Sequence, residues 1–130
     1  MPGRMEVVRR SPTVVLDAAH NPHGARAAAA AVTEAFEFTP LIGVIGAMAD
    51  KDVRGVLEIW SGVMQQVVVT QVASTSRGMP AEELAVLAAE VFGAERVTVA
   101  PRLDDAIETA VTLAESDGVG APGVLVTGSV

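Results

Sequence analysis

The chain is long enough for one domain with a substantial core, because a domain of 130 residues buries roughly two-thirds of the surface that its unfolded chain exposes. The formal charge is −7, there is one lysine, and 3% of the residues are aromatic. The sequence therefore has no basic stripe and no aromatic surface on which bases could stack, so no nucleic acid partner is expected. The lack of cysteine excludes disulfides and thiolate metal sites. No apolar run is long enough to cross a membrane, and the N-terminus lacks the apolar stretch of a signal peptide, so we expect a cytoplasmic protein.

Strands and helices alternate in the predicted secondary structure. Residues 5–10 and 13–17 are expected to form a hairpin across the turn at Ser11-Pro12. Asn21 as N-cap and Pro22 in the first helical position then open an alanine-rich helix over residues 22–36. Further strands are expected at residues 41–46, 67–70, 97–100 and 123–127, with helices from a cap at Asp50 or Asp52 to about residue 63, at 80–92 and at 104–115.

This alternation predicts a Rossmann-like, three-layer α/β/α fold. Its sheet is mostly parallel, has helices on both faces and carries an antiparallel N-terminal hairpin strand. The turns that follow the strands, at residues 17–21, 46–52, 71–78 and 128–129, should share one edge, which is the expected working surface. We expect a single domain over residues 1–130 that stops before a last helix.

The first of these turns has the composition of a binding site. An apolar strand runs into Asp17, a short loop carries His20, and Asn21-Pro22 starts the helix. The backbone N–H groups and the dipole at a helix N-terminus favour phosphate or carboxylate ligands. Asp17 and His20 are therefore candidate site residues.

The run LDAAHNPHG at residues 16–24 resembles the signature that opens the C-terminal domain of folylpolyglutamate synthase/dihydrofolate synthase, in the Mur ligase superfamily. Three further segments resemble the same family in the same order, and together they span nearly the whole chain: PGRME (residues 2–6), GAMADKD (46–52) and TGS (127–129).

The resemblance implies an ATP-dependent ligase that adds L-glutamate to reduced folates through an acyl phosphate. In that family a larger N-terminal ATPase domain holds the P-loop and the Mg²⁺ ligands, and the C-terminal domain closes over the nucleotide and the amino acid. The present sequence has no Gly-x-x-x-x-Gly-Lys-Ser/Thr motif. We therefore expect no metal ligand in this chain, a functional partner in its own N-terminal ATPase domain, and no activity from the chain alone.

The resemblance also assigns roles to individual residues. Arg4 matches an arginine that reaches the ATP phosphates, and Asp17 matches an aspartate that contacts the nucleotide, with the ribose hydroxyls as its expected partners. His20 matches a catalytic histidine near the reacting centre that orients the incoming glutamate.

Other candidates have competing structural explanations. Asn21 could contact substrate or could only cap its helix. Arg77 could hold a glutamate carboxylate with Ser74 beside it, although a solvated loop explains both equally well. Ser129 lies at a strand-to-helix turn suited to a carboxylate. The Asp-Lys-Asp run at residues 50–52 is explained by capping as well as by ligand contact.

Three alternatives stay open from the sequence. The chain could be the C-terminal domain of another Mur-type amide ligase, because related enzymes share an Asp…His-Asn-Pro element. It could be a stand-alone flavodoxin-like domain that binds a ligand without catalysis. It could also be a structural interaction module.

Overall fold

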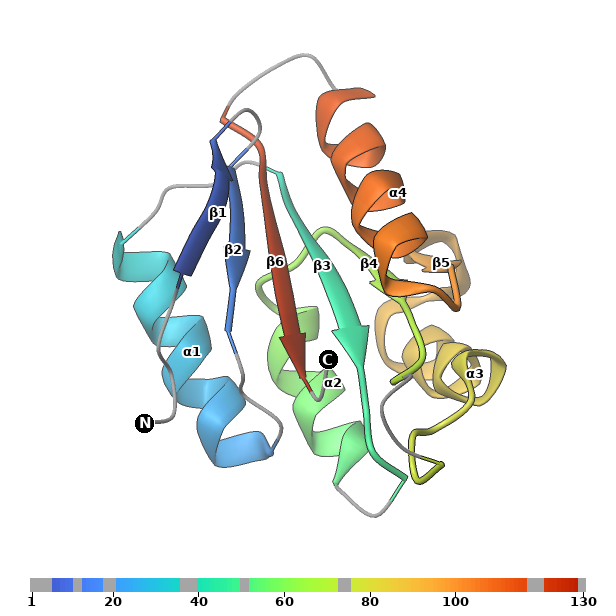
Figure 1. Ribbon diagram of the computed structural model, residues 1–130. Coiled ribbons are helices and arrows are strands. Elements are labelled where there is room, and N and C mark those ends of the chain that lie inside the picture. Colours follow the sequence, from blue (N-terminus) through green and yellow to red (C-terminus); the bar gives the residue numbers. More distant parts are fainter. Residues whose placement is uncertain are drawn as a thin grey trace.

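Six strands form one sheet in the order β1-β2-β6-β3-β4-β5 (Figure 1). In the computed structural model, the described residues are 6–10, 13–17, 21–35, 40–49, 52–72, 76–116 and 121–128. β1 pairs with β2 antiparallel, and every other pairing is parallel. The predicted parallel sheet with an N-terminal hairpin strand is therefore confirmed. The strands are Glu6–Arg10 (β1), Thr13–Leu16 (β2), Leu41–Gly46 (β3), Gln66–Val69 (β4), Val97–Val99 (β5) and Gly123–Gly128 (β6).

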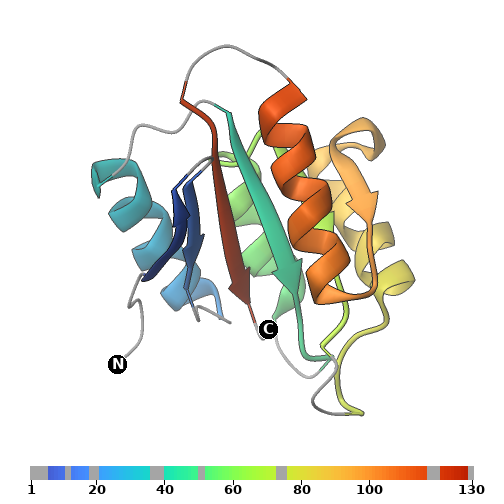
Figure 2. The ribbon, with the colours of Figure 1, turned by 45° about the horizontal axis from the view of Figure 1, so that its top comes forward.

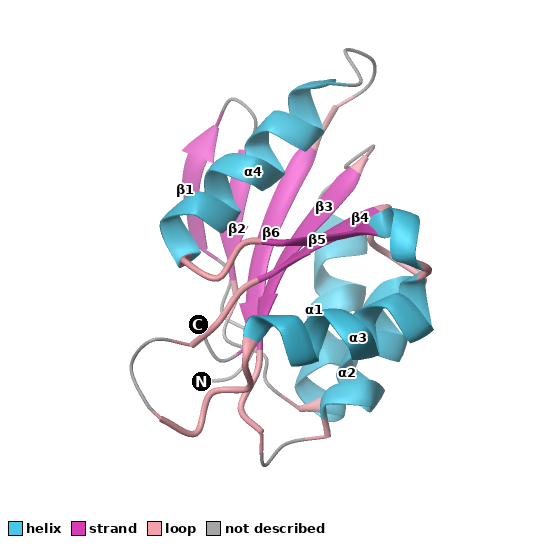
Figure 3. Cartoon of the chain, turned by 90° about the vertical axis from the view of Figure 1, so that its right-hand side faces the viewer, coloured by secondary structure: helices cyan, strands magenta, loops and turns pink. Residues whose placement is uncertain are grey.

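The helices cover both faces of the sheet, with α1, α2 and α3 on one side and α4 on the other (Figures 2 and 3). The connections from β2 to β3, from β3 to β4 and from β4 to β5 all step across the sheet in one direction. Right-handed crossovers that step in one direction place their helices on the same face of the sheet. The crossover from β5 to β6 steps back, so α4 lies on the opposite face. The helices are Pro22–Ala35 (α1), Val53–Ser61 (α2), Ala81–Phe92 (α3) and Leu103–Ser116 (α4), with a short 3₁₀ turn at Ala94–Arg96 (η1).

The predicted helix ends agree with the structure to within a few residues. Asp52 caps α2 by accepting a hydrogen bond from the Gly55 N–H at 3.1 Å. Gly93 ends α3 with a φ of +96°, a conformation in which glycine is favoured. Pro80 is the N-cap of α3 rather than its first helical residue, and the 3₁₀ turn was not predicted.

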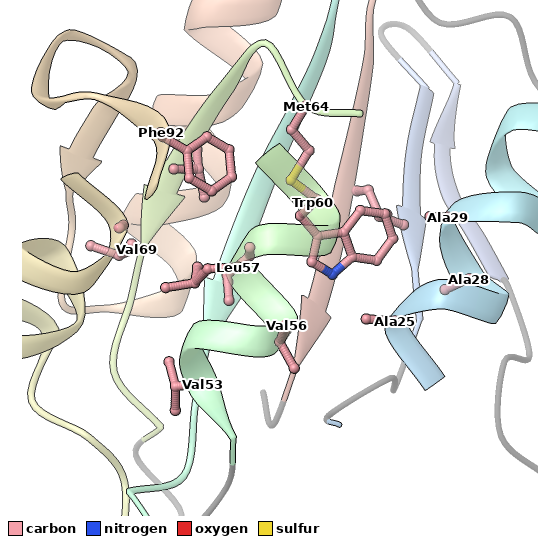
Figure 4. Close-up of a cluster of buried hydrophobic side chains, with 14 of the residues drawn as sticks. Ala25, Ala28, Ala29, Val53, Val56, Leu57, Trp60, Met64, Val69 and Phe92 are labelled. Atoms are coloured by element: carbon pink, nitrogen blue, oxygen red, sulfur yellow. The ribbon is translucent and has the colours of Figure 1, made fainter. Parts of the chain in front are cut away.

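Each face of the sheet has its own hydrophobic core. β3 and β6 are buried along their whole length because helices cover both of their faces. On the side of α1, α2 and α3, the buried indole of Trp60 lies between α2 and the small side chains of α1 (Figure 4). Those small side chains are Ala25, Ala28 and Ala29.

Candidate functional site at the carboxyl edge of the sheet

The carboxyl ends of the parallel strands lie along one edge of the sheet. In the ladder, Leu16 of β2 pairs with Val126 of β6, and Gly46 of β3 pairs with Gly128. The carboxyl ends of β2, β3, β4 and β6 therefore lie at the same edge, as the alternation of elements predicts. In open α/β sheets, ligands bind in the crevice outside this edge.

β3 and β6 approach each other closely at this edge. Gly128 has a φ of +93°, and a Cβ built on it would lie 2.1 Å from the carbonyl oxygen of Gly46. A side chain at residue 128 would force the two strand ends apart. Backbone alone therefore forms this part of the edge.

Asp17 is a buried acid directly after β2. Its N–H donates to the Val126 carbonyl at 2.9 Å, which continues the pairing of β2 with β6, and the residue is 4% exposed. A buried carboxylate is stabilised only by hydrogen bonds or opposite charge, so acids at such positions often have a functional role. Thr127, on the neighbouring strand, is also buried.

Asn21 caps α1, which begins at the same edge. Its Oδ1 accepts a hydrogen bond from the Gly24 N–H at 2.7 Å, and its carbonyl accepts one from the Ala25 N–H at 2.9 Å. The capping role expected from the sequence is confirmed, and a substrate contact of Asn21 stays a prediction. The positive end of the α1 dipole therefore lies at the carboxyl edge, a few residues after Asp17 in the sequence. It would stabilise an anion bound there.

The loops after β3 and β4 are tied together by an antiparallel bridge between Met48 and Gly78. The Ala49 N–H donates to the Arg77 carbonyl, and the Met79 N–H donates to the Ala47 carbonyl, both at 2.9 Å. The bridge fixes the backbone of Arg77 at the working edge and leaves its side chain exposed.

Gly78 is required in this bridged loop for steric reasons. A Cβ there would lie 2.8 Å from the carbonyl oxygen of Val72, on the other side of the loop. Replacement by any other residue would open the loop and move Arg77.

A pocket of about 400 Å³, which no local sequence pattern predicts, lies further along the edge, where β4 and β5 end. Gln71 lines it and links three segments: its N–H donates to the Pro101 carbonyl at 3.1 Å, and its Oε1 accepts from the Ala81 N–H at 3.2 Å. The buried Thr70 hydroxyl also donates to Pro101, at 3.0 Å. Only long-range pairing brings these groups together, so no local signal would have indicated them.

At the mouth of this pocket, the Arg102 guanidinium donates to Asp104 at 2.9 Å and 3.2 Å. Hydrogen bonding to Arg102 lowers the pKa of the Asp104 carboxyl below its ordinary value. Asp104 and Asp105 lie in the first turn of α4, where acidic side chains interact favourably with the helix dipole.

The structure describes three of the predicted site residues. Asp17, Asn21 and Arg77 all lie at the carboxyl edge, the first two between β2 and α1 and Arg77 in the loop after β4. The other candidates, Arg4, His20, Ser74 and Ser129, lie outside the described residues, as do Asp50 and Lys51.

Within the described ranges, no group of three or more His, Cys, Asp or Glu residues could hold a metal ion. Among the same residues, no helix is both long and apolar enough to cross a lipid bilayer.

A parallel α/β sheet with polar loops gathered at its carboxyl edge defines the class of Rossmann-like ligand-binding domains. Within that class, the chain belongs to the family of the Mur ligase, glutamate ligase domain, whose model matches residues 3–130.

The relatives with similar sequences include folate ligases. The chain is 42% identical, over 99% of its length, to dihydrofolate synthase/folylpolyglutamate synthase of Mycobacterium tuberculosis, of which it covers 28%. It is 38% identical, over 98% of its length, to a probable bifunctional folylpolyglutamate synthase/dihydropteroate synthase of Halobacterium salinarum, of which it covers 15%. The chain thus spans less than a third of the length of either relative.

Solved structures of similar proteins contain nucleotides. Folylpolyglutamate synthase of M. tuberculosis, complexed with ADP and AMPPCP, matches with a TM-score of 0.91 and 43% identity, over 99% of this chain and 30% of that one. A bifunctional folylpolyglutamate synthase/dihydrofolate synthase with Mn, AMPPNP and L-glutamate bound matches with a TM-score of 0.76 and 25% identity, over 99% of this chain and 29% of that one.

Proposed function

We propose that the chain is the C-terminal domain of an ATP-dependent ligase that adds L-glutamate to reduced folates, as a folylpolyglutamate synthase with or without dihydrofolate synthase activity. The observation that carries the proposal is the family match over residues 3–130, together with relatives named as folate ligases. The location we propose is the cytoplasm.

In this reaction, a folate carboxylate attacks the terminal phosphorus of ATP, which releases ADP and forms an acyl phosphate. The glutamate amine then attacks the acyl carbon, an amide bond forms, and phosphate leaves. Mg²⁺ held by the N-terminal ATPase domain would neutralise phosphate charge. The chain itself would contribute binding and orientation, which act by holding the reacting groups in place.

Asp17 supplies the nucleotide contact in this proposal. A carboxylate only accepts hydrogen bonds, so it suits a ribose diol that donates two. Arg4 would pair with the ATP phosphates, and His20 would orient the glutamate amine. Asn21, Ser74, Arg77 and Ser129 are the proposed contacts of the substrate carboxylates, for which a guanidinium offers paired donors.

The position of β1 indicates where a preceding domain would join this one. Glu6, the first residue of β1, pairs with Leu16, the last residue of β2, so β1 begins at the carboxyl edge. A domain that precedes β1 would therefore join the present one beside Asp17.

A hybrid enzyme tests the proposal. The segment of the M. tuberculosis relative that aligns with this chain is replaced by the chain, and incorporation of glutamate into reduced folate is measured with and without ATP. We expect ATP-dependent incorporation by the hybrid and none by the same relative with that segment deleted.

A hybrid that folds, binds ATP and incorporates no glutamate would contradict the proposal. If the hybrid incorporated a different amino acid into a different carboxylate, the chain would belong to another Mur-type amide ligase. Tight, saturable binding of a small ligand by the chain alone would instead favour a stand-alone binding domain.

A further inference from the structure

The first turns of α1 and α2 touch each other next to the carboxyl edge. A Cβ built on Gly55, in the first turn of α2, would lie 3.0 Å from Cγ of Pro22, the first residue of α1. The same Cβ would lie 2.6 Å from Oδ2 of Asp52, the cap of α2. A glycine inside a helix lowers its stability relative to alanine, so its presence here is explained by the close approach of both the Asp52 cap and the Pro22 ring.

The rest of the contact between the two helices is closely packed. Ala25 and Ala28 of α1 and Val56 and Trp60 of α2 are buried in the same cluster (Figure 4). A close-packed interface transmits a displacement instead of absorbing it. A larger residue at position 55 would therefore move the first turns of the helices, where the contact meets the carboxyl edge.

Both first turns come soon in the sequence after the strand ends that form this edge. Asn21 caps α1 shortly after Asp17 ends its pairing with β6, and Asp52 caps α2 shortly after the Met48 bridge. The distance between the helix starts thus sets how Asn21 lies relative to Asp52 at this edge.

We propose that Gly55 is a positioning residue: by letting the ring of Pro22 pack against α2, it sets the spacing of Asn21 and Asp52 at the starts of α1 and α2, and so the geometry of the nucleotide site. The expected effect on KM for ATP rests on the proposed function, whereas the contact between Gly55 and Pro22 does not.

The kinetic test uses Gly55→Ala in the hybrid enzyme. We expect KM for ATP to rise about 10-fold while kcat changes less than about twofold, because misplaced binding groups weaken the binding of ground state and transition state alike. The thermal midpoint should move little, because alanine is a better helix former and the same change disturbs the Asp52 cap. Gly62→Ala is the matched control, since a Cβ there has no neighbour closer than 3.9 Å.

Removal of the proline ring should rescue the variant. In a Pro22→Ala background, Gly55→Ala should change KM for ATP less than about twofold, because the atom that the new methyl group meets is gone. An unchanged KM in the Gly55→Ala hybrid would overturn the inference. So would rescue by Asp52→Ala instead of Pro22→Ala, because the effect would then come from the α2 cap alone.

An NMR comparison on the 130-residue chain tests the contact without any enzyme assay. The amide signals of Gly24 and Ala25, whose N–H groups donate to Asn21, should shift on Gly55→Ala when Pro22 is present and much less when it is alanine. Equal shifts in both backgrounds would contradict the contact. An inactive wild-type hybrid, by contrast, would contradict only the proposed ligase function.

Discussion

Asp17 combines a carboxyl group with burial at the working edge, where it is 4% exposed. Asp17→Asn keeps the size of the side chain but removes its charge, so it should weaken hydrogen bonds from the ribose hydroxyls more than it disturbs packing. We expect KM for ATP of the hybrid enzyme to rise about 10- to 100-fold, which corresponds to about 1.5–3 kcal/mol for hydrogen bonds to a charged group. Initial rates at varied ATP concentration measure the change.

Asp104→Asn is the control for that change. Asp104 is exposed and pairs with Arg102, and a solvent-exposed ion pair contributes little to stability or to a distant site. KM for ATP should therefore match that of the unchanged hybrid. If both variants raised KM equally, the effect at Asp17 would not be local.

Arg96 stabilises the fold away from the site. Its guanidinium donates to the carbonyls of Gln65 at 2.9 Å, Ser61 at 3.0 Å, Phe92 at 3.3 Å and Met64, so it satisfies oxygen atoms where α2 and α3 end. Lysine cannot match this planar set of donors. We expect Arg96→Lys to lower the free energy of unfolding by about 2 kcal/mol, measured by urea denaturation. An unchanged KM for ATP in the same hybrid would identify the role as structural, and an unchanged unfolding curve would contradict it.

At the scale of elements, the alanine run of α1 provides the small side chains that its buried face requires. Ala28 is fully buried in the cluster that contains the Trp60 indole, whereas Ala30 lies on the exposed side of the same helix. Ala28→Leu would place a larger side chain in a filled space and should lower the free energy of unfolding by about 1–3 kcal/mol, read from denaturant curves. Ala30→Leu should leave it nearly unchanged. Equal effects of the two substitutions on the free energy of unfolding would show that the change comes from helix propensity and not from packing.

The elements themselves were largely predictable because their signals are local. Asn21 with Pro22 marks the start of α1 as the sequence indicates, and Asp52 is one of the two caps that the sequence offers for α2. The bridge between Met48 and Gly78 was not predictable, because it joins residues that come together only after two strands have paired. The hydrogen bonds from the Arg96 guanidinium to backbone carbonyls were not predictable for the same reason.

At the scale of the whole molecule, topology places the candidate residues. Parallel strands have their carboxyl ends on one edge, so Asp17 and Asn21, which follow β2, share that edge with Arg77, which follows β4. Alternating strands and helices therefore predicted the edge. They could not predict which side chains there are buried, since burial depends on the strand order β2-β6-β3, in which the last strand lies between two earlier ones.

The proposed function divides the chemistry between this chain and an N-terminal ATPase domain. The sequence has no P-loop motif to hold phosphates, and no cluster of metal ligands occurs in the part of the chain that the structure describes. We therefore expect the 130-residue chain alone to release no ADP from ATP when reduced folate and glutamate are present, whereas the hybrid releases ADP. A coupled assay for ADP compares the two at equal concentration. Folate-dependent ADP release by the pure chain would mean that it holds a complete phosphoryl-transfer site, and the division of labour proposed above would be wrong.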